Sequence, residues 1–312
     1  MAGILSALET LPIIEGLRRS RARWRLLAFI AVAALLLVMG MRMIGQSNTA
    51  GPIIARVYVD GIMTTNPARL RVLSELRDND RVKAVLVNIN SPGGTTAAGE
   101  ELYEALLDVA EEKPVVAVIN ELGASAAYMT ALGADRIYAR RLSLVGSIGA
   151  FIQHLDAGGL MRTIGVDLDK VQSGPLKAEP DLDDPLTGAT RESLQGVVDD
   201  TFDWFVDIVA ERRNLSRDKV LPLADGRIMT GRMALADSLI DDVGGEQQAI
   251  AWLEEEKGVE KDLSVKTYYP LPENDLERLT RLIGSEAQKA IGLDVAGIVP
   301  LDGLVSLWHP DN

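Results

Sequence analysis

Two residues of complementary chemistry, a serine in a turn of small residues and a lysine farther along the chain, could together hydrolyse an acyl bond. Ser125 lies in the run Glu121-Leu-Gly-Ala-Ser-Ala-Ala-Tyr128, and Lys177 ends the run Ser173-Gly-Pro-Leu-Lys177. A serine hydroxyl becomes an effective nucleophile only when a base takes its proton. The chain has two histidines and no cysteine, so a Ser-His-Asp triad is hard to assemble and a cysteine nucleophile is excluded. The pattern therefore indicates a serine hydrolase with lysine as its base.

A lysine base must lose its charge, which requires shelter from water. The ordinary lysine pKa of about 10.4 falls when desolvation penalises the ammonium form. Pro175 and Leu176 give Lys177 apolar neighbours, whereas the nearby Glu179 must point away from it. A hydroxyl is also needed to orient the neutral amine, and Ser147 in Gly146-Ser-Ile-Gly149 is the candidate.

The tetrahedral intermediate of acyl transfer requires backbone N–H donors for its oxyanion. The loop Asn90-Ser-Pro-Gly-Gly94 offers Gly93 and Gly94, because glycine permits a close approach of the backbone. A second donor is the amide of Ala126, or that of Ser125 itself. We therefore expect Gly93, Gly94 and Ala126 to form the oxyanion hole.

Each motif alone has a simpler explanation, so the prediction depends on their order and spacing together. Ser125 could cap a helix, Lys177 could be solvated, and the Ser-Pro-Gly-Gly loop could be an ordinary turn. Lys170, seven residues before Lys177, is a rival base. Other polar residues are expected to have structural roles only. His154 is interpreted as a structural histidine. Asp181, Asp183 and Asp184 are interpreted as a solvated loop, because they lack the glycine and the distant glutamate of a calcium-binding loop.

The surrounding sequence predicts alternating strands and helices. Apolar runs typical of buried strands and segments with helical spacing alternate along the chain, which indicates an α/β domain with largely parallel pairing, followed by a more helical second half. The expected strands are 53–60, 83–90, 114–120, 136–139 and 263–268, and the expected helices are 68–76, 97–112, 123–132, 191–213, 233–239 and 246–256. The apolar stripe of 191–213 is expected to face the core.

This alternation also predicts where the candidate site lies. The loops that contain Gly93–Gly94 and Ser125 follow two consecutive strands of parallel type. Sites in open α/β sheets are usually built at the carboxyl ends of the strands. We therefore expect the two loops to be neighbours.

The N-terminal region has the features of a membrane anchor. Residues 26–41 carry no charged or strongly polar side chain, and the span can be extended to residue 45 because Arg42 can snorkel. Five arginines between residues 18 and 25 precede it, which predicts a cytoplasmic N-terminus and a catalytic domain outside the cytoplasm. A cleaved signal peptide and a soluble helix are the alternatives. The expected organisation is a cytoplasmic segment at 1–25, an anchor at 26–45, a linker at 46–52, a peptidase domain at 53–271 and a C-terminal extension at 272–312.

Composition excludes several other classes of protein. The 312-residue chain has a net charge of -13 and a pI near 4.7, which disfavours a nucleic-acid partner. Without cysteine it has no disulfide, thiolate metal site or thiol redox chemistry. No phosphate-binding loop or metal cluster is evident, so we expect neither a cofactor nor a metal.

The motifs together resemble the short, single-repeat form of signal peptide peptidase A, a family of membrane-anchored serine proteases. The resemblance covers about residues 53–253 and rests on Ser-Pro-Gly-Gly, Gly-Ala-Ser-Ala-Ala-Tyr, Gly-Ser-Ile-Gly and Ser-Gly-x-x-Lys in that order. It implies Ser125 as nucleophile, Lys177 as general base, Ser147 as the hydrogen-bond partner of the lysine, and a glycine of the Gly93–Gly94 pair as oxyanion donor.

The resemblance also implies the fold, the assembly and the substrates. The family fold is similar to that of the caseinolytic protease ClpP and the crotonases, a spiral of β-β-α units. Short members form homo-oligomeric rings, commonly octamers, in which neighbouring subunits contribute the serine and the lysine. The implied substrates are cleaved signal peptides and other unfolded apolar peptides. A crotonase-like acyl-CoA enzyme and a non-enzymatic membrane scaffold with a relict site are the alternative functions.

Overall fold

The structure is a computed structural model that describes residues 29–30, 32, 51–269 and 305–307. The chain divides into two compact units, Met1–Gly51 and Pro52–Asn312. In the first unit Phe29, Ile30 and Val32 are helical and exposed. Apart from these three residues, the predicted anchor at 26–45 lies outside the described residues. Across the described ranges, no helix combines the length and apolar composition that a membrane crossing requires.

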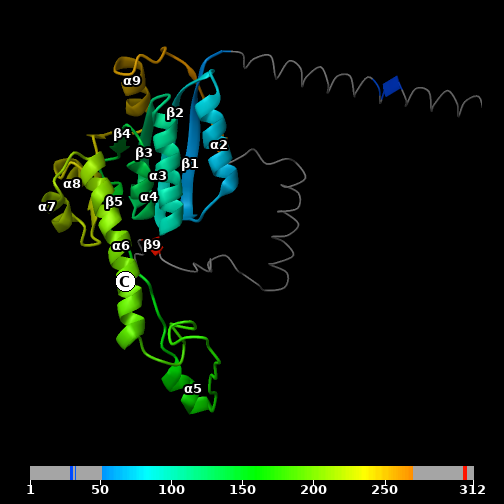
Figure 1. Ribbon diagram of the computed structural model, residues 1–312. Helices are drawn as coiled ribbons and strands as arrows, with labels where there is room; N and C mark the ends of the chain where they lie inside the picture. Colours follow the sequence, from blue (N-terminus) through cyan, green and yellow to red (C-terminus); the bar gives the residue numbers. More distant parts are fainter. Residues whose placement is uncertain (1–28, 31, 33–50, 270–304, 308–312) are drawn as a thin grey trace, which may run out of the picture. The chain divides into compact units, whose positions relative to one another are not determined.

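The second unit alternates strands and helices, as Figure 1 shows. Its strands are β1 (Ile53–Met63), β2 (Val82–Thr95), β3 (Val115–Ala124), β4 (Arg136–Ala139), β5 (Leu144–Gly146), β6 (Ile228–Thr230), β7 (Asp242–Val243), β8 (Ser264–Tyr269) and β9 (Val305–Leu307). Its helices are α2 (Pro67–Asp78), α3 (Thr96–Ala110), α4 (Ala126–Ala131), α5 (Gly158–Ile164), α6 (Gly188–Arg212), α7 (Arg217–Val220), α8 (Gly231–Ala236) and α9 (Glu246–Glu255), with a 3-10 turn at Leu221–Leu223.

The strands form one mixed sheet with the order β6-β5-β3-β2-β1-β8, and β4, β7 and β9 branch from this path. Strands β1, β2, β3 and β8 pair in parallel, and so do β3 with β4 and β5. The pairings of β5 with β6 and of β2 with β9 are antiparallel. A mixed α/β fold, as the sequence predicted, is therefore confirmed.

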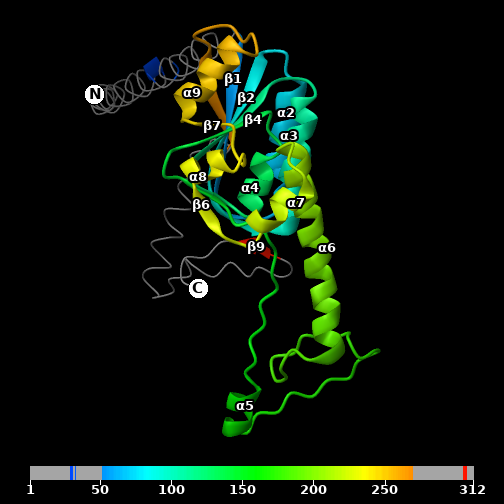
Figure 2. The ribbon, with the colours of Figure 1, turned by 90° about the vertical axis from the view of Figure 1, so that its left-hand side faces the viewer.

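The apolar strands bury both of their faces. Alternate residues of each central strand enter two separate cores: in β2, Val85 and Val87 pack into the larger core, while Ala84 and Leu86 pack into the smaller one. Continuous apolar runs are typical of strands covered on both faces. The smaller core contains Trp252 of α9, and α9 lies across the sheet from α2 and α3 (Figure 2).

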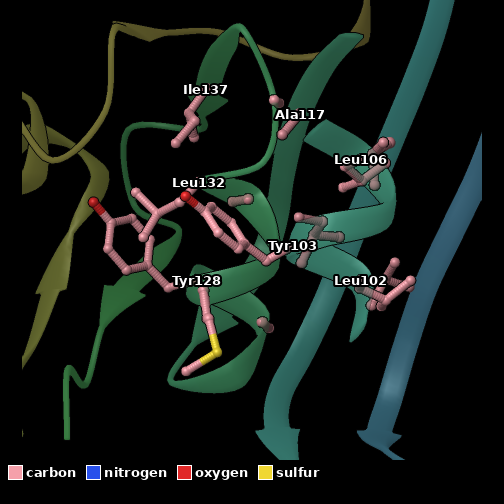
Figure 3. Packing of buried hydrophobic residues seen from close by; sticks show 14 of the residues in the cluster. Leu102, Tyr103, Leu106, Ala117, Tyr128, Leu132 and Ile137 are labelled. Carbon is pink, nitrogen blue, oxygen red and sulfur yellow. The ribbon is translucent and has the colours of Figure 1, made fainter. Parts of the chain in front are cut away.

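Helices α3 and α4 pack together over the larger core, close to Ser125. Figure 3 shows Leu102, Tyr103 and Leu106 of α3 in one buried cluster with Tyr128 of α4 and Ala117 of β3, and Tyr103 lies between the two leucines and Tyr128. The Tyr128 hydroxyl donates to the carbonyl of Leu239 at 2.7 Å, so this fully buried phenol is satisfied. Burial raises the pKa of Tyr128 well above its usual value. The helix that begins after Ser125 is thus rigidly held.

A projecting segment, residues 152–187, and the N-terminal half of α6 extend away from the sheet (Figures 1 and 2). Within this segment only Gly158 is buried. The prediction that the apolar stripe of 191–213 faces the core is wrong for its first half, because Leu194 is only half-buried and Val197 is exposed. The fully buried residues of α6 lie in its last turns, from Phe205 to Val209.

Several predicted boundaries shift in the structure. The predicted helix 123–132 begins only at Ala126, because β3 continues through Ala124. Strand β2 likewise continues through Gly93 and Gly94, which were predicted as a loop. The predicted C-terminal extension at 272–312 lies outside the described residues except for Val305–Leu307, which is a strand.

Candidate active site

Ser125 stands at a sharp turn from β3 into α4, in a backbone conformation that L-residues rarely adopt. Its φ is 58° and its ψ is -123°. The Ser125 N–H donates to the carbonyl of Gly146 on the neighbouring strand β5 at 2.8 Å. Although Ser125 occupies the N-cap position, its side chain makes no capping hydrogen bond to α4. The strained turn thus places Ser125 at the junction of β3 and α4, and its side chain does not cap the helix.

Ser147 lies beside Ser125 at the carboxyl ends of two paired strands. The last pair of the β3–β5 ladder is Ala124 with Gly146, and each serine is the next residue in its strand's chain. Ser147 also has a positive φ, 51°, and its N–H donates to the carbonyl of Arg227 at 2.7 Å. Both serines are buried, with exposures of 1% and 8%.

Gly93 and Gly94 lie within β2, next to β1. Gly93 has a φ of 103°, which glycine adopts without strain. A Cβ atom on Gly94 would clash with the backbone of Met63, its partner in β1, so this position requires glycine. β2 and β3 pair at Ser91 and Gly123, as expected for the two loops.

Ser91 holds this part of β2 in place, a role that sequence reasoning missed. Its hydroxyl donates to the carbonyl of Gly61 at 2.6 Å and accepts from the N–H of Gly93 at 3.1 Å. The serine of Ser-Pro-Gly-Gly was the available signal, because a short hydroxyl side chain commonly bonds to the backbone two residues on. In this state the Gly93 amide is directed to Ser91.

Helix α4 begins with Ala126, immediately after Ser125, and all six of its residues are buried. The first N–H groups of a helix have no acceptor within the helix. The Ala126 amide therefore has the backbone position that an oxyanion donor next to the nucleophile needs.

Lys177 lies elsewhere in the chain, on the projecting segment between α5 and α6. Its side chain is exposed, and its backbone N–H closes a turn by donating to the carbonyl of Gly174 at 3.1 Å. Within the described residues the Lys177 amine makes no hydrogen bond or ion pair. One copy of the chain thus brings Ser125, Ser147, Gly93 and Ala126 together, but places the predicted base on a different part of the fold.

Lys170, the rival base, is held by two carboxylates. Its amine lies 2.8 Å from Asp181 and 2.7 Å from Glu179. The hydrogen bond to Asp181, followed by that to Glu179, raises the pKa of Lys170, and the same contact lowers the pKa of Asp181. A lysine held in its charged form is a poor general base. Glu179, which had to point away from Lys177, is engaged by Lys170.

The remaining polar residues of the projecting segment have structural partners. His154 Nε2 lies 3.0 Å from the backbone carbonyl of Asp184, which agrees with a structural histidine. Among the described residues no group of acidic or histidine side chains could hold a metal ion.

Known proteins resemble this chain in sequence and fold. The model of the family described as "Peptidase family S49" matches residues 108–260. A protein of Methanocaldococcus jannaschii, named "Putative protease MJ0651", is 35% identical over 291 residues, which are 88% of this chain and 93% of the relative. The Enterococcus faecium protein named "Putative signal peptide peptidase SppA" is 32% identical over 192 residues, 60% of this chain and 55% of the relative.

Among solved structures, a ClpP1 mutant from Listeria monocytogenes matches with a TM-score of 0.41 and 14% identity, over 62% of this chain and 92% of the other. The sequence matches span the strands that present Ser125 and nearly the whole of the archaeal relative. The chain therefore belongs to peptidase family S49, and is a serine-type peptidase related to proteins named signal peptide peptidase A.

Proposed function

We propose that this protein is an endopeptidase with a Ser-Lys dyad, in which Lys177 of a neighbouring subunit acts as the general base for Ser125. The observation that supports it best is the separation of the two residues. A strained, buried serine lies next to Ser147 and the Gly93–Gly94 strand. Lys177, which has no ion-pair partner in the part of the chain that the structure describes, stands exposed on the projecting segment.

The proposed reaction is acyl transfer in two steps. The neutral Lys177 amine takes the proton of Ser125 as Oγ attacks the peptide carbonyl, and the resulting ammonium gives that proton to the leaving amine. Water then enters, is deprotonated by the same amine and releases the acyl group. Ser147 orients the amine, and the amides of Ala126 and of Gly93 or Gly94 stabilise the oxyanion. For Gly93 this requires its N–H to leave Ser91.

The surface of the projecting segment supports an assembly. Large apolar side chains that a single copy leaves exposed are Leu155, Leu160, Ile164, Val166, Leu168, Val171, Leu176 and Leu182. A concentration of exposed large apolar side chains in one segment supports an interface with another protein chain. Packing it on a neighbouring subunit would also desolvate Lys177, and desolvation favours an uncharged amine. We propose a homo-oligomeric ring, an octamer, of subunits with the ClpP-like spiral fold.

The N-terminal sequence supports a location of the protein at a membrane. We propose that residues 1–25 are cytoplasmic, that residues 26–45 form a single membrane anchor, and that a linker at 46–52 joins it to a peptidase domain at 53–271 on the outer side. Recessed sites in a ring would admit extended chains and exclude folded proteins. Cleaved signal peptides and other unfolded apolar peptides are extended chains that could reach such recessed sites.

Two substitutions with matched controls test the dyad. Ser125→Ala and Lys177→Met should each abolish hydrolysis of an unstructured apolar peptide, because one removes the nucleophile and the other replaces the base with a side chain of similar length. Lys170→Met, in the same segment, should keep at least half of the wild-type kcat/KM. The assembly state and thermal melting of each variant are measured alongside. Full hydrolysis by Lys177→Met, or its loss only in Lys170→Met, would refute the assignment of the base.

A further inference from the structure

A buried arginine lines a cavity at the carboxyl end of β1. Arg69, in the first turn of α2, is only 6% exposed. Its Nη2 donates to the carbonyl of Thr64 at 3.0 Å, but its buried Nε has no acceptor, and among the described residues no carboxylate forms an ion pair with the guanidinium. Burial lowers the pKa of Arg69. A charged arginine is seldom buried unless an anion accompanies it, so this side chain indicates a binding site for an anion.

The cavity has a volume of about 270 Å³ and offers a second donor to an anion. Strand β8 pairs with β1 as far as Val57, and its last residue, Tyr269, lines the cavity. The Tyr269 hydroxyl accepts from Asn66 Nδ2 at 2.9 Å, so its own hydrogen is left to donate. Asn66 Oδ1 already accepts the N–H groups of Ala68 and Arg69 at the start of α2. The guanidinium and the phenol, and not the end of the helix, are therefore the donors that a ligand would meet.

Two carboxylates lie near Arg69, and among the described side chains neither forms an ion pair with it. Asp60 lines the same cavity and is exposed. Glu101 of α3 attracts the guanidinium from a greater distance and accepts from the N–H of Asn66 at 3.0 Å. Burial raises the pKa of Asp60. A bound anion would be repelled by Asp60, which makes that residue a second probe of the site.

The donors suit a carboxylate better than other anions. The planar guanidinium donates two parallel hydrogen bonds to the two oxygens of a carboxylate, and the phenol can add a third. The small volume of the cavity limits the ligand to a small group, such as the end of a peptide.

The cavity lies at the same end of the sheet as Ser125. Ile62, which lines the cavity, pairs with Gly93 of β2, and Ser125 follows β3 on the other side of β2. Neighbouring strands are about 4.8 Å apart, so roughly 10 Å separates β1 from β3. An extended peptide spans that distance with about three or four residues. A peptide whose end lies in the cavity is therefore long enough to reach the candidate nucleophile.

We propose that Arg69 and the Tyr269 hydroxyl bind the C-terminal carboxylate of a peptide substrate whose preceding residues extend toward Ser125. This inference rests on the proposed function and narrows its substrates to peptides with a free C-terminus. A signal peptide gains that carboxylate only when it is cut from its precursor, because until then the same carbonyl belongs to an uncharged peptide bond. The cavity thus distinguishes a released signal peptide from one that is still attached.

Fluorescence anisotropy on the full chain with Ser125→Ala tests the binding without hydrolysis. The probe is a fluorescein-labelled hexapeptide of alanine and leucine that ends either in a free carboxylate or in an amide. The acid should bind at least tenfold more tightly than the amide. Adding Arg69→Met should reduce this preference to less than twofold, because the charged donor is lost. Asp80→Asn, just beyond the far end of α2, is the control and should keep the tenfold preference.

Asp60→Asn tests the same site if Arg69→Met fails to fold. Asp60 is exposed, so the substitution should leave the fold intact. Removing a negative charge from the cavity should strengthen binding of the acid about threefold and leave binding of the amide unchanged. A preference for the acid below twofold in the parent protein, or no change of that preference in Asp60→Asn, overturns the inference. Binding of N-acetyl-leucine as tight as that of the hexapeptide acid would identify a site for small free carboxylates and overturn the assignment to a peptide end.

Hydrolysis by the protein with Ser125 intact separates this inference from the proposed function. The preference for the acid should then appear in kcat/KM. Hydrolysis of both hexapeptides with equal kcat/KM, together with equal binding, overturns the inference alone. If neither hexapeptide nor any other unstructured apolar peptide is hydrolysed, the proposed function fails, and the anisotropy measurement still decides whether Arg69 binds a carboxylate.

Discussion

Ser125 combines a nucleophilic side chain with a backbone conformation that is costly for any residue with a Cβ atom. A non-glycine residue at a positive φ outside the common regions costs on the order of 1–3 kcal/mol, and the surrounding contacts must offset it. Here the hydrogen bond from the Ser125 N–H to Gly146 and the buried helix α4 hold the turn. Under the proposed function, this conformation serves catalysis at a cost in stability.

This strain predicts different stabilities for two inactive variants. Ser125→Gly should be more stable than Ser125→Ala by about 1 kcal/mol, because glycine adopts the conformation without a Cβ penalty, a gain larger than its extra unfolded-state entropy. Both should lack peptidase activity. Chemical denaturation of the two proteins measures the difference, and an alanine variant at least as stable as the glycine variant would show that the turn is unstrained.

Gly94 is the residue at which close strand packing tolerates no side chain. Gly94→Ala should destabilise the protein by about 3 kcal/mol or prevent folding, because the added methyl group meets the backbone of Met63 and neither strand can move away. Gly159→Ala is the matched control, since nothing lies near a Cβ at that position in α5. It should leave stability equal or slightly higher. Similar melting temperatures for the two variants would contradict this account of the β1–β2 contact.

At the scale of elements, apolar periodicity predicted the strands and helices of the sheet well. The runs at 53–60, 83–90 and 114–120 became β1, β2 and β3, because each buries both faces. The small residues Gly123 and Ala124 read as helix in sequence, but they extend β3 because pairing with β2 and β5 outweighs local preference. The candidate turn around Ser125 was predictable from the motif, whereas the pairing of β5 with β6, brought together across 80 residues, was not.

The first half of α6 shows what periodicity cannot specify. An apolar stripe predicts that a helix face is covered, but the covering partner can be another molecule. The helix packs against its own core from Phe202 onward, and Val197 is left exposed.

The contrast between the exposed projecting segment and the buried sheet predicts where an added protease cuts this protein. At concentrations that favour single subunits, limited proteolysis should cleave first within residues 152–187, because most residues there are exposed in one copy and only Gly158 is buried. Raising the protein concentration should protect the segment if neighbours cover it. Mass spectrometry of the fragments locates the cuts. First cuts within β1–β3 instead, or equal cutting at all concentrations, would count against the proposed interface.

At the scale of the whole molecule, the described part of one chain holds the predicted nucleophile, Ser125, and the predicted base, Lys177, on different parts of the fold. The sequence predicts both Ser125 and Lys177. In the proposed function the two residues meet only when copies of the chain pack together, and the sequence pattern of one chain does not specify contacts between chains. Two features support that proposal. The projecting segment exposes large apolar side chains, and within the described residues ion pairs engage Lys170 but not Lys177.

A mixing experiment distinguishes a shared site from a self-contained one. Ser125→Ala and Lys177→Met are each inactive if both residues are essential, and neither chain alone contains a complete dyad. If neighbouring subunits share each site, random assembly of an equal mixture pairs an intact serine with an intact lysine in about one quarter of the sites, so about 25% of wild-type activity returns. The subunits are dissociated, mixed and reassembled before peptide hydrolysis is measured, with each variant reassembled alone as the control. If the dyad lay within one chain, every site in the mixture would lack one partner, and activity would stay at the level of the separate variants.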